Sequence, residues 1–329
     1  MGFAGPLFLV GMPRSGTKLL RELLNRHPRI AIPPAETEFL PYLVRCIERF
    51  GDLSDFSRFE RFHKHIGDSS YFQYRQDYGP PLSAGAWYAK CRDFTAAGIF
   101  EALVRIDVEA PVDSDIVWGD KSPSYIDDLT LISRLYPSAK FIHLIRDVRD
   151  YCLSINAAWS KNMLRASQRW VDDVERARDV GRTLGATTYT ELRYEDLLRD
   201  PTNALLRLCD FLGVEFDASM TLLERPTENL GNAKGEARIV ADNFGEYRKR
   251  MPRGVLIEIE AIAGETLLAC GYELAAPVQP RRRMPEWRMR AAQLRDGWNL
   301  LQSKRDRFGW LANVKHSLRY FSITRAGRR

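Results

Sequence analysis

A glycine-containing turn near the start of the chain has the composition of an anion-binding loop. The segment FLVGMPRSGTKLLRELL places an apolar run before the turn and an amphipathic helical pattern after it. A helix that begins here directs the backbone N–H groups of Ser15, Gly16 and Thr17, and the positive end of its dipole, toward one point. Gly16 lets the backbone approach an anion closely. The spacing therefore favours a phosphate-binding loop over a simple helix cap.

The residues after Gly16 separate this loop from the loop of the ATPases. Those loops read GxxxxGK[ST], in which the lysine binds phosphate and the hydroxyl binds magnesium. In this chain Thr17 precedes Lys18, so the lysine lies further along the helix. The later segment FIHLIRD ends in Arg146 before Asp147 and does not match the apolar setting of a magnesium-binding acid. A nucleotide kinase is disfavoured and remains an alternative from a different class.

The elements that must position these residues alternate between strand and helix. Short apolar runs bounded by turn signals are typical of buried parallel strands and cover residues 7–10, 29–32, 116–118, 140–145 and 187–192. Helical spacing follows over residues 17–25, 125–135, 148–158, 165–184 and 203–212. This order predicts an α/β fold with a parallel sheet of about five strands flanked by helices. Residues that follow the strands then share one crevice at the carboxyl edge.

Composition divides the chain into a main domain and a basic extension. We expect a domain over residues 1–274, with a helical, aromatic-rich insertion at residues 50–115 on the acceptor side. The net charge of the chain is +6, yet residues 275–329 hold 14 Lys and Arg against three acidic residues. This extension carries Trp287, Leu294, Trp298, Leu301 and Phe308 at helical spacing, which predicts a basic amphipathic helix.

Several classes of site are disfavoured by what the sequence contains. The five cysteines have no CxxC spacing, which argues against a zinc site or a disulfide framework and fits a cytoplasmic protein. His63 and His65 have no acidic or thiol partner at ligand spacing, so no metal is expected. No stretch approaches 18 apolar residues, and the start of the chain does not resemble a signal peptide.

A set of ordered motifs gives the sequence a family resemblance. GMPRSGTKLL, AETEF after HP, GDKSP, FIHLIRDVRDYCLS, and LRYEDLLRDP with FLGV together resemble the sulfotransferases that use 3′-phosphoadenosine 5′-phosphosulfate (PAPS). The resemblance covers about residues 7–272 and is nearest to the PRSGT branch, which includes tyrosylprotein and bacterial carbohydrate sulfotransferases. It implies a single P-loop-like α/β domain that takes PAPS as sulfuryl donor without a metal.

The resemblance also implies a role for individual residues in donor binding. The first loop, with Arg14, Ser15, Gly16, Thr17 and Lys18, is expected to hold the 5′-phosphosulfate. Three residues further along the chain complete the donor site: Arg146 and Ser154 are the expected partners of the 3′-phosphate, and Tyr194 is expected near the adenine.

Three charged residues are expected to carry out the transfer. Arg14 and Lys121 would stabilise the negative charge that develops on the leaving group. Glu36 is the predicted general base for the acceptor hydroxyl. Glu38 is the alternative base. On a helix the side chains of Glu36 and Glu38 would point about 200° away from each other, so both could face the site only if the segment is extended.

The acceptor is predicted only as a class. A hydroxyl of a glycan, glycolipid or related carbohydrate is expected, since aromatic side chains of the insertion could stack on sugars, although they could equally form core. A protein tyrosine or a small natural product is the alternative. The basic extension matches no nucleic-acid motif, so no nucleic acid is expected. Its helix is expected to bury its apolar stripe either on the domain or at an anionic membrane, which places the protein in the cytoplasm or at the inner membrane face.

Overall fold

The structure, a computed structural model, describes residues 2–67, 69–111, 113–227, 233–277 and 279–303. Within these residues one parallel sheet has the strand order β2-β3-β1-β4-β5. Its strands are β1 (Leu7–Gly11), β2 (Ile30–Ala31), β3 (Val117–Lys121), β4 (Lys140–Ile145) and β5 (Tyr189–Arg193). The predicted five-stranded parallel α/β sheet is confirmed, with each strand within two or three residues of the apolar run that predicted it.

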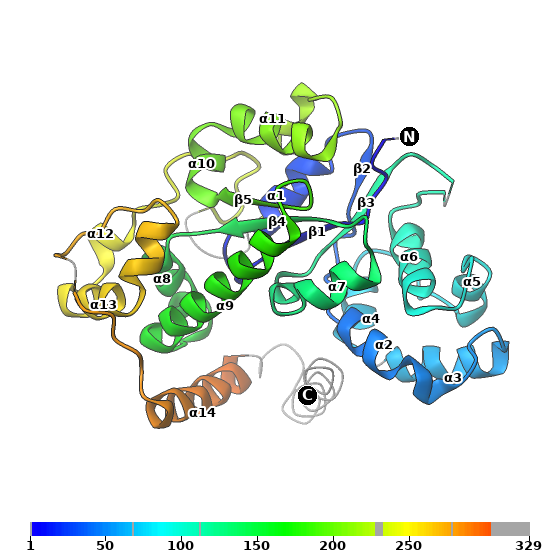
Figure 1. The fold of residues 1–329 in the computed structure, drawn as a ribbon, viewed down its shortest axis with the longest axis horizontal. Helices are drawn as coiled ribbons and strands as arrows, with labels where there is room; N and C mark the ends of the chain where they lie inside the picture. The colour runs from blue at the N-terminus through cyan, green and yellow to red at the C-terminus, as the bar shows by residue number, and fades with distance from the viewer. Residues whose placement is uncertain (1, 68, 112, 228–232, 278, 304–329) are drawn as a thin grey trace.

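The helices of the described residues surround this sheet (Figure 1). They are α1 (Thr17–Leu24), α2 (Leu40–Cys46), α3 (Phe56–Ile66), α4 (Ser70–Arg75), α5 (Ala84–Tyr88), α6 (Ala96–Asp107), α7 (Leu129–Leu135), α8 (Val148–Trp159), α9 (Met163–Leu184), α10 (Tyr194–Arg199), α11 (Pro201–Leu212), α12 (Tyr247–Arg250), α13 (Arg253–Ala269) and α14 (Glu286–Ser303). Short 3-10 helices are η1 (Ile47–Phe50), η2 (Pro123–Asp127) and η3 (Ala218–Thr221).

Both faces of the central strands are covered, which explains why β1 reads as a continuous apolar run. Leu7 and Leu9 of β1 pack under α1, α10 and α11 on one face. Phe8 and Val10 alternate with them and pack on the other face with side chains of η2, α7 and the insertion. Leu9 is in register with Lys121, the last residue of β3, and with Ile142 of β4, so the carboxyl ends of the central strands lie on one side of the sheet, with β3 ending before β1 and β4.

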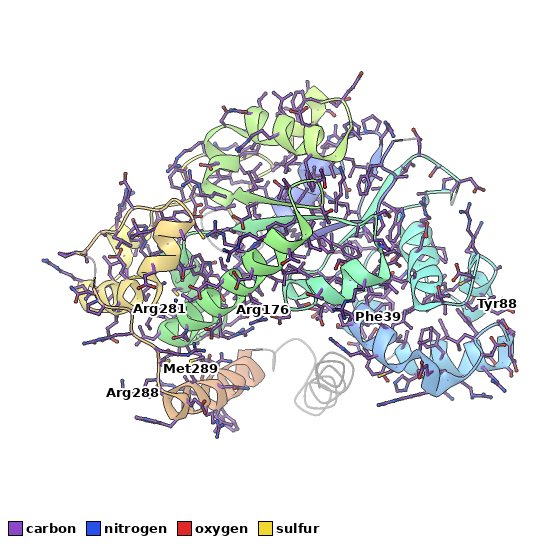
Figure 2. All side chains as sticks on the ribbon, viewed as in Figure 1. Phe39, Tyr88, Arg176, Arg281, Arg288 and Met289 are labelled. Atoms are coloured by element: carbon purple, nitrogen blue, oxygen red, sulfur yellow. The ribbon has the colours of Figure 1, made fainter. Side chains whose placement is uncertain are left out.

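The insertion at residues 50–115 forms helices α3 to α6, without a strand among its described residues. Its aromatic side chains pack against one another, and Phe59, Phe62, Tyr71 and Trp87 are fully buried. Phe39 belongs to the same cluster and Tyr88 packs against it; both are labelled in Figure 2. The buried rings form core and are not exposed to stack on a sugar, whereas Phe56 and Tyr78 of the insertion are exposed.

The extension contains the predicted helix, α14, but the helix meets the domain through an unpredicted face. Asp296 accepts hydrogen bonds from Arg165 Nη1 and the Asn162 amide, each at 2.8 Å, and Asn299 donates to the Ser160 carbonyl. Three residues of the predicted stripe are exposed, Trp287 at 67%, Leu294 at 78% and Trp298 at 63%. Of the two surfaces expected to bury the stripe, the domain does not bury these three side chains, because the buried ion pair of Asp296 with Arg165 holds the opposite side of the helix. Phe308 lies outside the described residues.

Candidate active site

The loop between β1 and α1 has the geometry of an anion-binding turn. The Ser15 amide donates to the Met12 carbonyl at 3.1 Å, and Arg14 and Gly16 take left-handed backbone conformations with φ of 70° and 91°. α1 then begins at Thr17, and none of the described side chains caps its first amides. The Ser15 hydroxyl is buried and has no hydrogen-bond partner among the described residues. The Ser15 hydroxyl and the first amides of α1 are therefore available to an anion. The Ser15 amide, which was expected to face the anion, is instead used within the loop.

Three predicted donor-site residues meet beside this loop, although they are far apart in the sequence. Arg14 Nε donates to Ser154 Oγ of α8 at 3.3 Å, and Arg146 Nη1 donates to the Arg14 carbonyl at 2.9 Å. Arg146 directly follows β4, and its Nε is buried without a hydrogen-bond partner among the described residues. Arg146 therefore has an unused donor beside the loop, which an anionic ligand there could accept.

The ring of Tyr194 packs against Gly16 of the loop and against Arg146. Its ring lies against the guanidinium of Arg146, whose Cζ is 4.6 Å from the ring centroid. A Cβ atom at Gly16 would lie 2.3 Å from the same ring, so only glycine allows this approach. The Tyr194 hydroxyl accepts a hydrogen bond from Asn243 at 3.0 Å, and the residue is 4% exposed. The observed contacts fix Arg146 and the loop backbone, while the role near adenine stays a prediction.

Lys121 and Glu36 form an ion pair next to the loop. Lys121 is the last residue of β3, and its ammonium donates to Glu36 Oε1. The lysine side chain is 4% exposed and the glutamate side chain 39% exposed. Lys121, predicted to stabilise the leaving group, and Glu36, the predicted base, therefore lie in contact. Of the two, the Glu36 carboxylate is the more exposed to solvent.

Glu36 and Glu38 are not on a helix, because the chain from residue 35 to residue 39 is irregular and α2 begins only at Leu40. Glu38 has a φ of 53°, and its amide donates to Ser122 Oγ at 3.2 Å. Both carboxylate residues line the same cavity. The geometric reason for choosing only one of them therefore does not apply in this structure.

Burial changes the acidity of two carboxyl groups here. Burial, with the nearby charge of Glu36, raises the pKa of Glu38 to about 7. Burial also raises the pKa of Asp120 to about 6, against the lowering effect of the Ser122 and Thr37 hydroxyls. A carboxyl that titrates near neutral pH suits proton transfer, so the structure strengthens Glu38 as an alternative base.

The raised pKa of Glu38 predicts a pH-dependent stability effect. The ordinary value is 4.5, so in the unfolded chain this carboxyl loses its proton at lower pH than in the folded chain. Folding stability therefore falls as the pH rises from about 4.5 to about 7. Glu38→Gln removes this cost and should stabilise the fold at pH 8 by up to about 3 kcal/mol, with little effect at pH 4.5.

Thermal or denaturant unfolding of Glu38→Gln and wild type at both pH values measures this difference. Glu60→Gln is the matched control, because Glu60 is exposed. A stability difference for Glu38→Gln that does not grow with pH would contradict the raised pKa.

A cavity of about 1110 Å³ extends from the loop and the two glutamates to the extension. Several charged side chains that line the cavity form ion pairs: Arg45 with Asp128 at 2.8 Å, and Arg176 with Asp127 at 2.6 Å. Arg176 of α9 and Met289 of α14, both labelled in Figure 2, belong to its lining. Leu294 and Trp298 also line the cavity. The sequence did not indicate this role of α14, because helical spacing does not show what a helix faces.

The described residues contain no group of three or more side chains suited to a metal ion. His63 Nε2 contacts the Leu82 carbonyl at 2.8 Å, and His65 Nε2 contacts the Tyr42 hydroxyl at 2.8 Å. Both histidines therefore have structural partners, His63 within the insertion and His65 in α2. No described helix is long and apolar enough to cross a bilayer.

Comparisons with known proteins identify similar sequences. A family model described as "Sulfotransferase family" matches residues 6–218. Nodulation protein NoeE of Sinorhizobium fredii is 29% identical over 153 residues, covering 46% of this chain and 31% of NoeE. Protein-tyrosine sulfotransferase 1 of Homo sapiens is 30% identical over 143 residues, covering 44% of this chain and 31% of that protein. The match thus spans less than a third of either relative.

A solved structure shares the fold. The sulfotransferase domain from the curacin biosynthetic pathway aligns with a TM-score of 0.55 and 19% identity, over 83% of this chain and 100% of that domain. At this identity the similarity concerns the α/β architecture alone.

Proposed function

Because the chain belongs to the sulfotransferase family, we propose that it transfers a sulfuryl group from PAPS to an acceptor hydroxyl. The observation that carries this proposal is the meeting of Arg14, Arg146 and Ser154 at the start of α1, beside the Lys121–Glu36 pair. The first group presents donors for a doubly phosphorylated nucleotide, and the second presents a cation and a carboxylate.

The donors beside the start of α1 fit PAPS. The buried Ser15 hydroxyl and the first amides of α1, with Lys18 in its first turn, suit the 5′-phosphosulfate. Arg146 and Ser154 suit the 3′-phosphate, since arginine gives a charge-assisted grip on phosphate oxygens. When bound, PAPS supplies a sulfuryl group on a stable phosphate leaving group.

In the proposed reaction the acceptor oxygen forms a bond to sulfur while the bond from sulfur to the bridging phosphate oxygen breaks. Arg14 and Lys121 stabilise the charge that develops on the bridging and sulfuryl oxygens. The Lys121 ammonium has three N–H donors, so it can hold Glu36 and a sulfuryl oxygen together. Glu36 accepts the proton that the acceptor hydroxyl loses, and positioning supplies much of the rest.

We propose a carbohydrate-bearing acceptor as the first candidate. Its support is the cavity wall, in which carboxylates and arginines such as Glu38, Asp127 and Arg176 offer polar partners for several hydroxyl groups. The aromatic core of the insertion gives no support. A protein tyrosine is the second candidate, because one relative is a protein-tyrosine sulfotransferase.

The donor-site assignment predicts selective losses of affinity. Arg146→Ala and Ser154→Ala should each weaken binding of adenosine 3′,5′-bisphosphate by about 10-fold to 100-fold, because a hydrogen bond to a charged group contributes about 1.5 to 3 kcal/mol. Affinity for adenosine 5′-monophosphate, which lacks the 3′-phosphate, should change little. Isothermal titration with both nucleotides measures the two effects.

Arg193→Ala is a matched control for Arg146→Ala, because Arg193 ends the neighbouring strand β5 and pairs with Asp196 at 2.8 Å. It should not distinguish between the two nucleotides. Equal losses for both nucleotides in Arg146→Ala and Ser154→Ala would show that these residues only maintain the loop.

A further inference from the structure

The helix α14 has two unlike faces. Ala292, Asp296 and Asn299 face the domain, and Asp296 is 4% exposed. Trp287, Leu294 and Trp298 form the second face, which we call the outer stripe. At about 100° per residue, the outer stripe spans about 40° and is centred about 150° from the docked face. The side of the helix that carries the tryptophans is therefore directed away from the docked face.

The outer stripe is unusual for the surface of this protein. Of the large apolar side chains more than 60% exposed in the described residues, three of four belong to the outer stripe, and the fourth is Leu222. Such a concentration of exposed apolar side chains on one helix marks an interaction surface. The outer stripe is therefore a candidate surface for binding another molecule.

The charges around the outer stripe indicate the chemistry of that occupant. Arg288, Arg290 and Arg295 of the same helix are exposed, and Glu286 is the acidic residue paired with Arg290 at 3.4 Å. In Figure 2, Arg288 lies at the end of α14 nearest the segment that leads into it. Tryptophan and leucine on one face with arginines beside it are typical of helices that lie in the interface of an anionic membrane.

The outer stripe also adjoins the active-site cavity. Leu294 and Trp298 belong to both, and the same cavity is lined by Glu36 and Glu38. A lipid surface in contact with the outer stripe would therefore lie at the edge of this cavity. An amphiphile could keep its apolar part in the lipid while its hydroxyl enters the cavity.

We propose that α14 binds an anionic lipid surface through the outer stripe and its arginines, and that the acceptor is an amphiphile drawn from that surface. The lipid contact is inferred from the exposed apolar side chains and the exposed arginines of α14. The statement about the acceptor rests on the proposed sulfotransferase function.

Co-sedimentation of the full chain with vesicles tests the lipid contact. Vesicles of phosphatidylcholine alone are compared with vesicles that contain 30% phosphatidylserine, at low and high salt. We expect binding to the anionic vesicles that weakens with salt, and at least about tenfold weaker binding in a variant with Trp287→Ser, Arg288→Glu and Arg295→Glu. These three residues do not line the cavity, so this variant should keep its affinity for adenosine 3′,5′-bisphosphate.

Leu222→Ser with Arg182→Glu is the matched control, because both side chains are similarly exposed on other elements. It should bind the anionic vesicles as wild type does. The lipid contact would be overturned if wild type ignores anionic vesicles, if the α14 variant binds them normally, or if analytical ultracentrifugation shows that the outer stripe instead joins two copies of the chain. Vesicle binding without bisphosphate binding would overturn the proposed function and leave the lipid contact standing.

Discussion

Lys121→Met is expected to lower kcat by about 10²-fold to 10³-fold while leaving the affinity for adenosine 3′,5′-bisphosphate within a few-fold of wild type. The reason is that the Lys121 ammonium is buried at the end of β3, where it is held by Glu36 before any substrate binds. A preorganised donor of this kind contributes mainly when charge develops in the transition state. Steady-state kinetics with PAPS and a hydroxyl acceptor, with titration of the bisphosphate, separates these two effects.

Lys140→Met is the matched control for this variant. Lys140 is the first residue of β4, so it lies at the amino ends of the strands, away from the site. Its ammonium donates to the Phe211 carbonyl. Its loss should affect stability more than turnover. If Lys121→Met keeps near wild-type kcat, Lys121 has no part in the transfer.

Glu36→Gln should lower kcat by about 10²-fold to 10⁴-fold, the range for loss of a general base, while nucleotide binding persists. The glutamine can still accept a hydrogen bond from Lys121, so the ion-pair partner keeps its position. Part of the activity should return at higher pH, as the acceptor hydroxyl ionises without help. A pH profile of kcat for wild type and variant measures both effects.

Glu38→Gln provides the internal comparison, since both residues line the cavity. It should retain most of the activity while changing stability with pH as described above. If Glu38→Gln loses the activity and Glu36→Gln does not, Glu38 is the base. Its pKa of about 7 would then be the property that the reaction uses.

The centre of the sheet could be predicted from the sequence because β1 and β4 are buried on both faces. Residues 7–10 are a continuous apolar run for this reason, residues 140–145 are apolar apart from Lys140 and His143, and β1 and β4 coincide with these segments. The site residues next to strand ends followed from the same pattern. Lys121 ends β3 and Arg146 follows β4, so the parallel order alone brings them to one edge of the sheet.

Other features depend on contacts that no local pattern contains. α13 was not predicted, because residues 259–264 are buried in succession and leave no amphipathic period to detect. The placement of α14 depends on contacts between distant residues, such as the ion pair of Asp296 with Arg165, which are 131 positions apart, and the hydrogen bond from Asn299 to the Ser160 carbonyl. Glu36 and Glu38 share a cavity because their segment is irregular, whereas the spacing argument assumed a helix.

The insertion shows why residue type alone could not identify the acceptor. Phe59 and Trp87 have the side chains that stack on sugars, and the same side chains are also efficient core residues. Burial decides between these roles, and both are fully buried. The aromatic ring that does line the cavity is Trp298, which belongs to the extension.

Titration of the wild-type chain with adenosine 3′,5′-bisphosphate, adenosine 5′-monophosphate and magnesium ATP tests the central claim most directly. Arg146 and Ser154 are proposed to hold the 3′-phosphate, so the bisphosphate should bind about 100-fold more tightly than the monophosphate. Magnesium ATP should bind no better than the monophosphate. Equal affinity for the bisphosphate and the monophosphate, or tighter binding of magnesium ATP, would contradict a PAPS-dependent sulfotransferase.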